Sequence, residues 1–184
     1  HSQCYHHQYL SIHGTMPVNF SKNSSDSIDS VLDIIAGKRP SVQWESHAFN
    51  KVGEARGKLV GGNLSMLYSL QGTPYAVETK GNILFFEDLD EYLYHIDRIM
   101  QNFWHARVLQ AAAGIVIGAL SDMNDNSTPF GKNAEEIVNS YTEKLGIPIA
   151  FAAPFGHVDR NLALLHGAEV SLRVDDSISR LDYV

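Results

Sequence analysis

Strand-like apolar runs alternate with amphipathic helices between residues 83 and 153, and this alternation restricts the possible folds more than any other feature of the chain. The runs at 83–86, 114–118 and 147–153 are short, bulky and continuous, as in strands that are covered on both faces. Between them, apolar side chains recur at helical spacing over 90–107 and 134–145. We therefore predict an α/β or α+β fold with a mixed, partly parallel sheet and flanking helices.

Shorter elements are expected on both sides of this region. The polar loop Ser21 to Asp26 supplies a helix cap, and the apolar positions after it predict a helix over 26–36 that ends at Gly37. Alternating residues predict further strands, and a turn at Gly61-Gly62-Asn63 separates one of them from a short helix. The expected strands lie at 42–44, 54–60, 167–174 and 179–184, and the short helix lies at 64–70.

Size and charge limit the classes of partner. A chain of 184 residues, 44% of them hydrophobic, suits one domain with a single core. The formal net charge of −7 leaves no basic surface to neutralise phosphates, so nucleic acid is not an expected partner. No apolar run approaches the roughly 20 residues of a membrane span, so no membrane association is expected. The single cysteine, Cys4, rules out an internal disulfide and favours the cytoplasm.

The first residues lack the signals of a natural start. No initiator methionine or signal peptide is present, and no capping residue precedes residues 1–10, which we expect to be the tail of a helix. Residues 1–20 are accordingly expected to be the end of a truncated N-terminal domain or a linker, and 21–184 the domain proper.

Four histidines near the start raise the question of a metal site. No cysteine or acidic residue stands at ligand spacing from them, so we expect no metal and no other cofactor. These histidines are His1, His6, His7 and His13.

Two polar side chains each follow directly on an apolar strand, where a sheet delivers functional groups to the crevice at its edge. Glu87 follows the run 83–86, and His157 lies in the turn Pro154-Phe155-Gly156-His157. If the two strands are parallel neighbours, both side chains emerge at the same edge. A carboxylate beside an imidazole is the orienting half of a nucleophilic triad. The simpler alternative is a helix-capping acid and a solvated histidine.

The nucleophile for such a pair is missing from the sequence. No Gly-x-Ser-x-Gly elbow occurs, and neither Ser2 nor Cys4 has an apolar strand in front of it. Asp88 should point to the opposite face of the strand from Glu87 and cap the helix that follows. Asn63 has two open interpretations, a donor to a substrate peptide carbonyl or a cap for the next helix.

Five stretches along the chain carry a family resemblance. They are Ile12-His13-Gly14-Thr15-Met16-Pro17, Leu59-Val60-Gly61-Gly62-Asn63-Leu64, Leu70-Gln71-Gly72-Thr73-Pro74, residues 83–91 with Ile96-Asp97-Arg98, and Phe155-Gly156-His157. In this order, and over nearly the whole chain, they resemble the C-terminal domain of LD-carboxypeptidases, serine peptidases that trim cell-wall peptides. Glu87 and His157 stand where that family has its triad acid and histidine.

The resemblance implies a swivelling β/β/α barrel-like fold and a Ser-His-Glu triad in which His157 is the general base and Glu87 orients it. It places the serine in a separate N-terminal domain, so this chain alone is expected to be inactive. The implied substrate is a muropeptide tetrapeptide that loses D-alanine in bacterial cell-wall recycling.

Two alternative functions stay open, and two protein partners are expected besides the substrate. A related enzyme that cleaves a peptide–nucleotide antibiotic for self-immunity has the same core motifs, and a non-catalytic domain could hold peptide in the Gly61-Gly62-Asn63 crevice. Retention of Glu87 and His157 argues against the second. Loss of a neighbouring domain exposes apolar surface, so we also expect the missing N-terminal domain as a partner and self-association as a homodimer.

Overall fold

The computed structural model describes residues 9–184 and is organised around a seven-stranded mixed sheet in the order β2-β9-β8-β3-β4-β5-β6. Its strands are β2 (Val42–Glu45), β3 (Gly53–Asn63), β4 (Ile83–Leu89), β5 (Gly114–Ser121), β6 (Ile149–Ala150), β8 (Glu169–Val174) and β9 (Ile178–Tyr183). A second sheet pairs β1 (Ser11–His13) with β7 (Leu164–His166) in antiparallel orientation. The predicted mixed, partly parallel sheet with flanking helices is confirmed.

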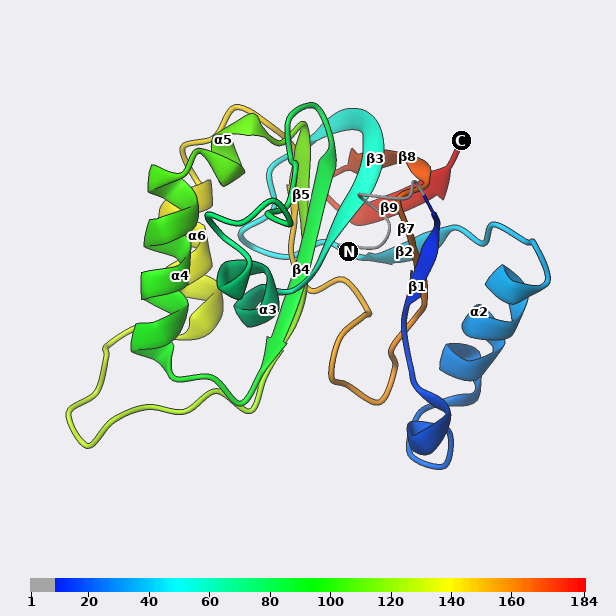
Figure 1. Ribbon diagram of the computed structural model, residues 1–184, viewed down its shortest axis with the longest axis horizontal. Helices are drawn as coiled ribbons and strands as arrows, with labels where there is room; N and C mark the ends of the chain where they lie inside the picture. The colour runs from blue at the N-terminus through cyan, green and yellow to red at the C-terminus, as the bar shows by residue number, and fades with distance from the viewer. Residues whose placement is uncertain (1–8) are drawn as a thin grey trace.

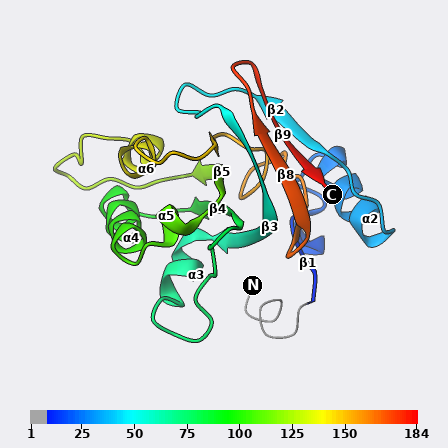
Figure 2. The ribbon, with the colours of Figure 1, turned by 90° about the horizontal axis from the view of Figure 1, so that it is seen from above.

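The long strand β3 joins the two halves of the main sheet. Its first part, Gly53–Lys58, pairs antiparallel with β8, whereas Leu59–Asn63 pairs parallel with β4. Beyond β4, the strands β5 and β6 continue in the parallel direction. Figure 2 shows β3 passing from the antiparallel half, beside β8, to the parallel half, beside β4. The carboxyl ends of β3 and β4 consequently lie side by side.

Helices cover the parallel half and flank the second sheet. They are α2 (Ser25–Ile35), α3 (Leu64–Ser69), α4 (Leu93–His105), α5 (Val108–Ala111) and α6 (Ala134–Thr142), with a 3-10 turn η1 (Pro17–Asn19). In Figure 1, α4, α5 and α6 lie together beside β4 and β5, and α2 lies at the other side of the molecule, next to β1. Among residues 9–184 no helix is long and apolar enough to cross a bilayer.

The pleat of β4 divides the core into two layers. Leu84 and Phe86 pack under the helices, with the apolar faces of α4 and α6, while Ile83 and Phe85 pack on the opposite face against β8 and β9 side chains. All four side chains are fully buried, as expected for a strand covered on both faces. Side chains alternate between faces, so the polar residues that end β4 are also sent to opposite layers.

Several predicted boundaries differ from the structure. The helix expected over 90–107 begins at Leu93, because Asp90 has a left-handed backbone (φ 58°) that no helix continues. The strand expected over 147–153 keeps only Ile149–Ala150, since Ala152 is also left-handed (φ 57°).

Four short elements, β1, η1, β7 and α5, were not predicted. The expected helix tail over residues 1–10 falls mostly outside the described part of the chain, and Tyr9 and Leu10 are not helical.

Candidate active site

Glu87 lies at the carboxyl end of β4, with its side chain 1% exposed. It is the register partner of Asn63 on β3, and on the other side the pairing with β5 shifts between Phe86 and Asp88. Such a bulge re-aims the side chain at the irregular position, and bulges are common beside active sites. Glu87 is therefore part of the strand rather than the residue after it, and a fixed element of the sheet holds it.

His157 reaches Glu87 from the loop that follows β6. Its Nδ1 donates a hydrogen bond of 2.7 Å to Oε2 of Glu87, and its side chain is half exposed (50%). The strands β4 and β6 are not neighbours, because β5 lies between them, but all three are parallel and end at the same edge. The sequence prediction that the two side chains meet is confirmed, although the strand adjacency assumed for it is wrong.

Close packing holds the His157 loop against the sheet. Gly156 has a left-handed backbone (φ 112°), and a Cβ there would lie 2.9 Å from the Cβ of Glu87. Its N–H donates to Oδ1 of Asn161, and Ser121 at the end of β5 donates to the carbonyl of His157. A larger residue at position 156 would push His157 away from Glu87.

The electrostatic environment suits an acid that orients a base. Burial raises the pKa of the Glu87 carboxyl, and the neighbouring charge of Asp88 raises it further, while the hydrogen bond from His157 acts in the opposite direction. An ionised carboxylate only accepts hydrogen bonds, so it selects the His157 tautomer with the proton on Nδ1. Nε2 of the half-exposed ring is then free to accept a proton from another group.

His13 faces the carboxylate oxygen of Glu87 that His157 does not contact. Its Nε2 lies 3.8 Å from Oε1 of Glu87, and its ring makes edge contacts with Phe85 and Phe155. Burial, reinforced by the charge of His157, lowers the pKa of His13 to about 4. From the sequence, His13 was expected only as one of four histidines that do not bind metal and as part of the stretch Ile12 to Pro17. Because His13 lies in a strand of only three residues, the sequence pattern did not indicate that it would lie near Glu87.

Asp88 points to the other face of β4, as predicted, but it does not cap the helix predicted there. Its carboxylate accepts hydrogen bonds from the backbone N–H and the hydroxyl of Ser65 at the start of α3, and from the side-chain amide of Asn63. Asn63 also caps α3, accepting from the N–H of Met66. The capping interpretation of Asn63 is confirmed, and its substrate-binding role stays a prediction.

Two hollows adjoin the Glu87–His157 pair. One, of about 530 Å³, is lined by His13, Glu87 and His157 together with polar side chains that include Lys22 and Asp122. The other, of about 340 Å³, lies beside His13 and is lined by Gly61, Gly62 and Asn63. His13 lines both, so the residues of the expected peptide crevice are adjacent to the acid–histidine pair.

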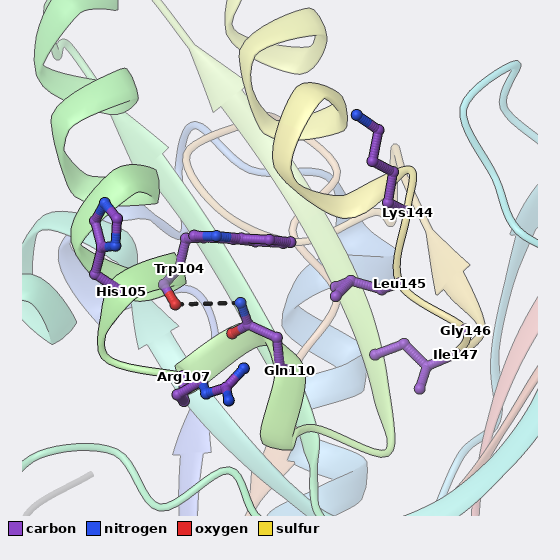
Figure 3. A pocket seen from close by; sticks show the side chains of 8 residues that line it. All are labelled: Trp104, His105, Arg107, Gln110, Lys144, Leu145, Gly146 and Ile147. Atoms are coloured by element: carbon purple, nitrogen blue, oxygen red, sulfur yellow. Dashed lines mark hydrogen bonds between the residues drawn. The ribbon is translucent and has the colours of Figure 1, made fainter.

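A larger hollow at the opposite end of the sheet has a different character. Figure 3 shows Trp104, His105 and Arg107 at the end of α4 facing the segment Lys144–Ile147, which leads into β6. Its basic side chains follow the carboxyl ends of α4 and α6, where cations offset the helix dipole. We regard it as a structural feature of the amino ends of the parallel strands, which is not where open α/β sheets place their ligands.

An α/β sheet that brings a buried carboxylate and a half-exposed imidazole together at the carboxyl ends of its strands has the arrangement of a hydrolase acid–histidine pair. Comparison with known proteins defines the family. The sequence pattern of the LD-carboxypeptidase C-terminal domain matches residues 56–172, and the chain belongs to this family.

Individual relatives agree with this assignment. The chain is 32% identical over 130 residues to a Bacillus subtilis protein named "Probable murein peptide carboxypeptidase", covering 71% of this chain and 41% of the relative. The solved structure of muramoyltetrapeptide carboxypeptidase from Oxalobacter formigenes is 26% identical, with a TM-score of 0.86 over 96% of this chain and 62% of that one. The microcin C7 self-immunity protein MccF shares the fold, with a TM-score of 0.78 at 17% identity. The chain thus spans about half the length of such relatives.

The site as a whole contains the groups for proton transfer but no described metal centre. Among residues 9–184 no group of three or more histidine, cysteine, aspartate or glutamate side chains could hold a metal ion. His1, His6 and His7 lie outside the described residues.

Proposed function

We propose that this chain supplies the acid–base half of the active site of a serine LD-carboxypeptidase that removes a terminal D-amino acid, D-alanine, from muropeptide tetrapeptides. The observation that carries the proposal is the 2.7 Å hydrogen bond between Nδ1 of His157 and the buried Oε2 of Glu87. Family membership and the murein-related names of the relatives support the choice of reaction and substrate.

The proposed roles follow from the geometry. A serine outside these 184 residues attacks the carbonyl of the scissile bond, and Nε2 of His157 accepts the serine proton. His157 then gives that proton to the amine of the leaving D-alanine, and a water molecule hydrolyses the acyl-enzyme by the same steps in reverse order. Glu87 keeps the imidazole in the required tautomer and stabilises the imidazolium that forms in each step.

The serine and the site of action complete the proposal. Within this scheme the serine belongs to a preceding domain that docks over the carboxyl ends of β3 and β4, and the chain alone is inactive. The single cysteine suits a reducing compartment, and we propose the cytoplasm as the place of action. Reading the coding DNA upstream of His1 would identify the domain to join to this chain.

The decisive assay measures D-alanine release from a tetrapeptide muropeptide. We expect activity from the chain joined to its serine domain and none from the chain alone. Glu87→Gln keeps the shape of the side chain but removes its charge, so we expect a loss of kcat of about 10⁴-fold. Glu91→Gln, on the same segment but bound to His95, is the matched control and should retain activity. Equal activity of the Glu87 and Glu91 variants would contradict the triad.

A second candidate is cleavage of a peptide–nucleotide conjugate for self-immunity. It is favoured by the fold shared with the microcin C7 self-immunity protein. The two functions differ in the leaving group, an amino acid in one case and a nucleotide derivative in the other. Activity on the nucleotide conjugate together with no release of D-alanine would select this alternative.

A further inference from the structure

Each oxygen of the Glu87 carboxylate has an imidazole near it, and the two imidazoles differ in exposure and packing. His157 contacts Oε2 at 2.7 Å from an exposed loop, whereas Nε2 of His13 faces Oε1 at 3.8 Å from strand β1. The side chain of His13 is 26% exposed, about half the value of His157. The His157 ring is therefore the more open of the two to an incoming group.

Packing fixes the His13 ring independently of Glu87. Its ring meets the edges of Phe85 and Phe155, with centroids 5.3 and 6.2 Å away. Phe85 is two residues before Glu87 on β4, and Phe155 is two residues before His157 on the loop. Backbone pairing of His13 with Leu164 adds a third anchor. The ring is therefore located by the same two segments that carry the acid–histidine pair.

The charge state of His13 decides what it can do for Glu87. Because burial lowers the pKa of His13 to about 4, its ring is neutral at neutral pH and does not form an ion pair with the carboxylate. A separation of 3.8 Å is also longer than a hydrogen bond, and a shift of about 1 Å would bring the two atoms into hydrogen-bond range. A neutral N–H donor can orient a carboxylate without neutralising the charge that His157 needs.

We propose that His13 is a positioning residue: its neutral ring presents the Nε2 proton to Oε1 of Glu87 and holds Oε2 toward Nδ1 of His157. The inference rests on the proposed function only in giving the pair a catalytic purpose, because the positioning itself is measurable in this chain without a nucleophile. Within residues 9–184, the other titratable or charged groups near the three side chains are Asp88 on β4, His166 on β7, and Lys22, Asp122 and Asp159 on the wall of the hollow.

Two substitutions separate hydrogen bonding from packing. His13→Gln retains an N–H donor, and His13→Leu retains apolar contact with the two phenylalanine rings but has no donor. His166→Leu is the control, because His166 contacts the same Phe85 ring from β7, with centroids 6.0 Å apart. Each variant is made in the 184-residue chain with ¹³C and ¹⁵N labels, and thermal unfolding verifies that it folds.

The readouts are the titration midpoint of the Glu87 carboxyl, from its ¹³C shift, and the tautomer of neutral His157, from its ¹⁵N shifts. For His13→Leu we expect the Glu87 midpoint to rise by about half a pKa unit or more, and the Nδ1–H tautomer of His157 to lose population. His13→Gln and His166→Leu should match the wild type in both readouts.

If His13→Leu left the Glu87 midpoint and the His157 tautomer as in the wild type, the proposal would be overturned. Equal changes in the Leu and Gln variants would also overturn it, since they would indicate that only packing matters. Absence of peptidase activity in the complete enzyme would instead reject the proposed function and leave these NMR results standing.

Discussion

Gly61 and Gly62 offer a matched pair for testing why β3 has two adjacent glycines just before its last residue. Both have a backbone that L-residues rarely adopt, with φ of 149° and 147°. A Cβ on Gly61 would lie 1.8 Å from the carbonyl oxygen of Phe85 on β4, whereas a Cβ on Gly62 would have no heavy atom of residues 9–184 within 4 Å. Gly61→Ala therefore adds a steric clash with a backbone atom, and Gly62→Ala does not.

The magnitudes follow from this difference. Backbone strain should lower the free energy of unfolding by about 1–3 kcal/mol in both variants. Gly61→Ala should lose about 3 kcal/mol more, at the upper end for overpacking, because a sheet carbonyl has little freedom to move. For a domain of this size, that extra loss corresponds to a melting temperature about 6–12 °C below that of Gly62→Ala.

Thermal unfolding followed by circular dichroism measures both variants against the wild type, and urea unfolding supplies the free energies. Melting temperatures that agree within about 2 °C between the two variants would refute the close-approach argument. In Gly61→Ala the displaced Phe85 also moves Glu87, so the Glu87–His157 hydrogen bond should weaken in that variant alone.

Three other predictions concern capping, acid stability and association. Asp88→Asn weakens the acceptor for the first turn of α3, so we expect a loss of about 1–2 kcal/mol in urea unfolding; an unchanged midpoint would contradict the capping role. Burial lowers the pKa of His13 and of His166 to about 4, so the unfolded chain takes up protons first as pH falls below 6.5. Stability should then be complete above about pH 6.5 and fall toward pH 4, by up to about 3 kcal/mol per histidine, and His166→Phe should reduce this pH dependence in unfolding at pH 7 and 4.5. Met16 and Val18 are largely exposed beside the active-site hollow, so we expect self-association in sedimentation velocity, and a monomer at high concentration would count against it.

The main sheet was predictable because its signals are local. The apolar runs at 83–86 and 114–118 are short, bulky and continuous, as in strands covered on both faces, and they became β4 and β5. The order of strands was not predictable, because the insertion of β5 between β4 and β6 depends on contacts far apart in sequence. The glycine pair was misread as a turn for a related reason. Both glycines belong to β3, and Gly61 lets β3 approach β4 closely, which only the neighbouring strand reveals.

In the active site, too, residues with a local sequence signal were predicted and residues that depend on long-range contacts were not. Glu87 and His157 were identified because each polar residue comes at or just after an apolar strand, and the family resemblance then narrowed their roles. His13 and Ser65 were not, because one contacts Glu87 only through the pairing of β1 with β7 and the other contacts Asp88 only through the packing of α3 on β4. Short strands and helix starts carry weak sequence signals, so interactions that depend on them require the three-dimensional arrangement.

The adjacent carboxylates of β4 couple the stability of this edge to its chemistry. Asp88 holds the start of α3 and the Asn63 amide, while Glu87, on the opposite face, holds His157. The charge of Asp88 raises the pKa of Glu87, which opposes the ionised form that orients an imidazole. The hydrogen bond from His157 lowers the pKa of Glu87, and the proposed hydrogen bond from His13 would lower it further. An uncharged residue at position 88 should therefore lower the pKa of Glu87 and at the same time destabilise α3. The charge of Asp88 thus stabilises the helix start but disfavours the ionised form of Glu87 that orients the imidazole.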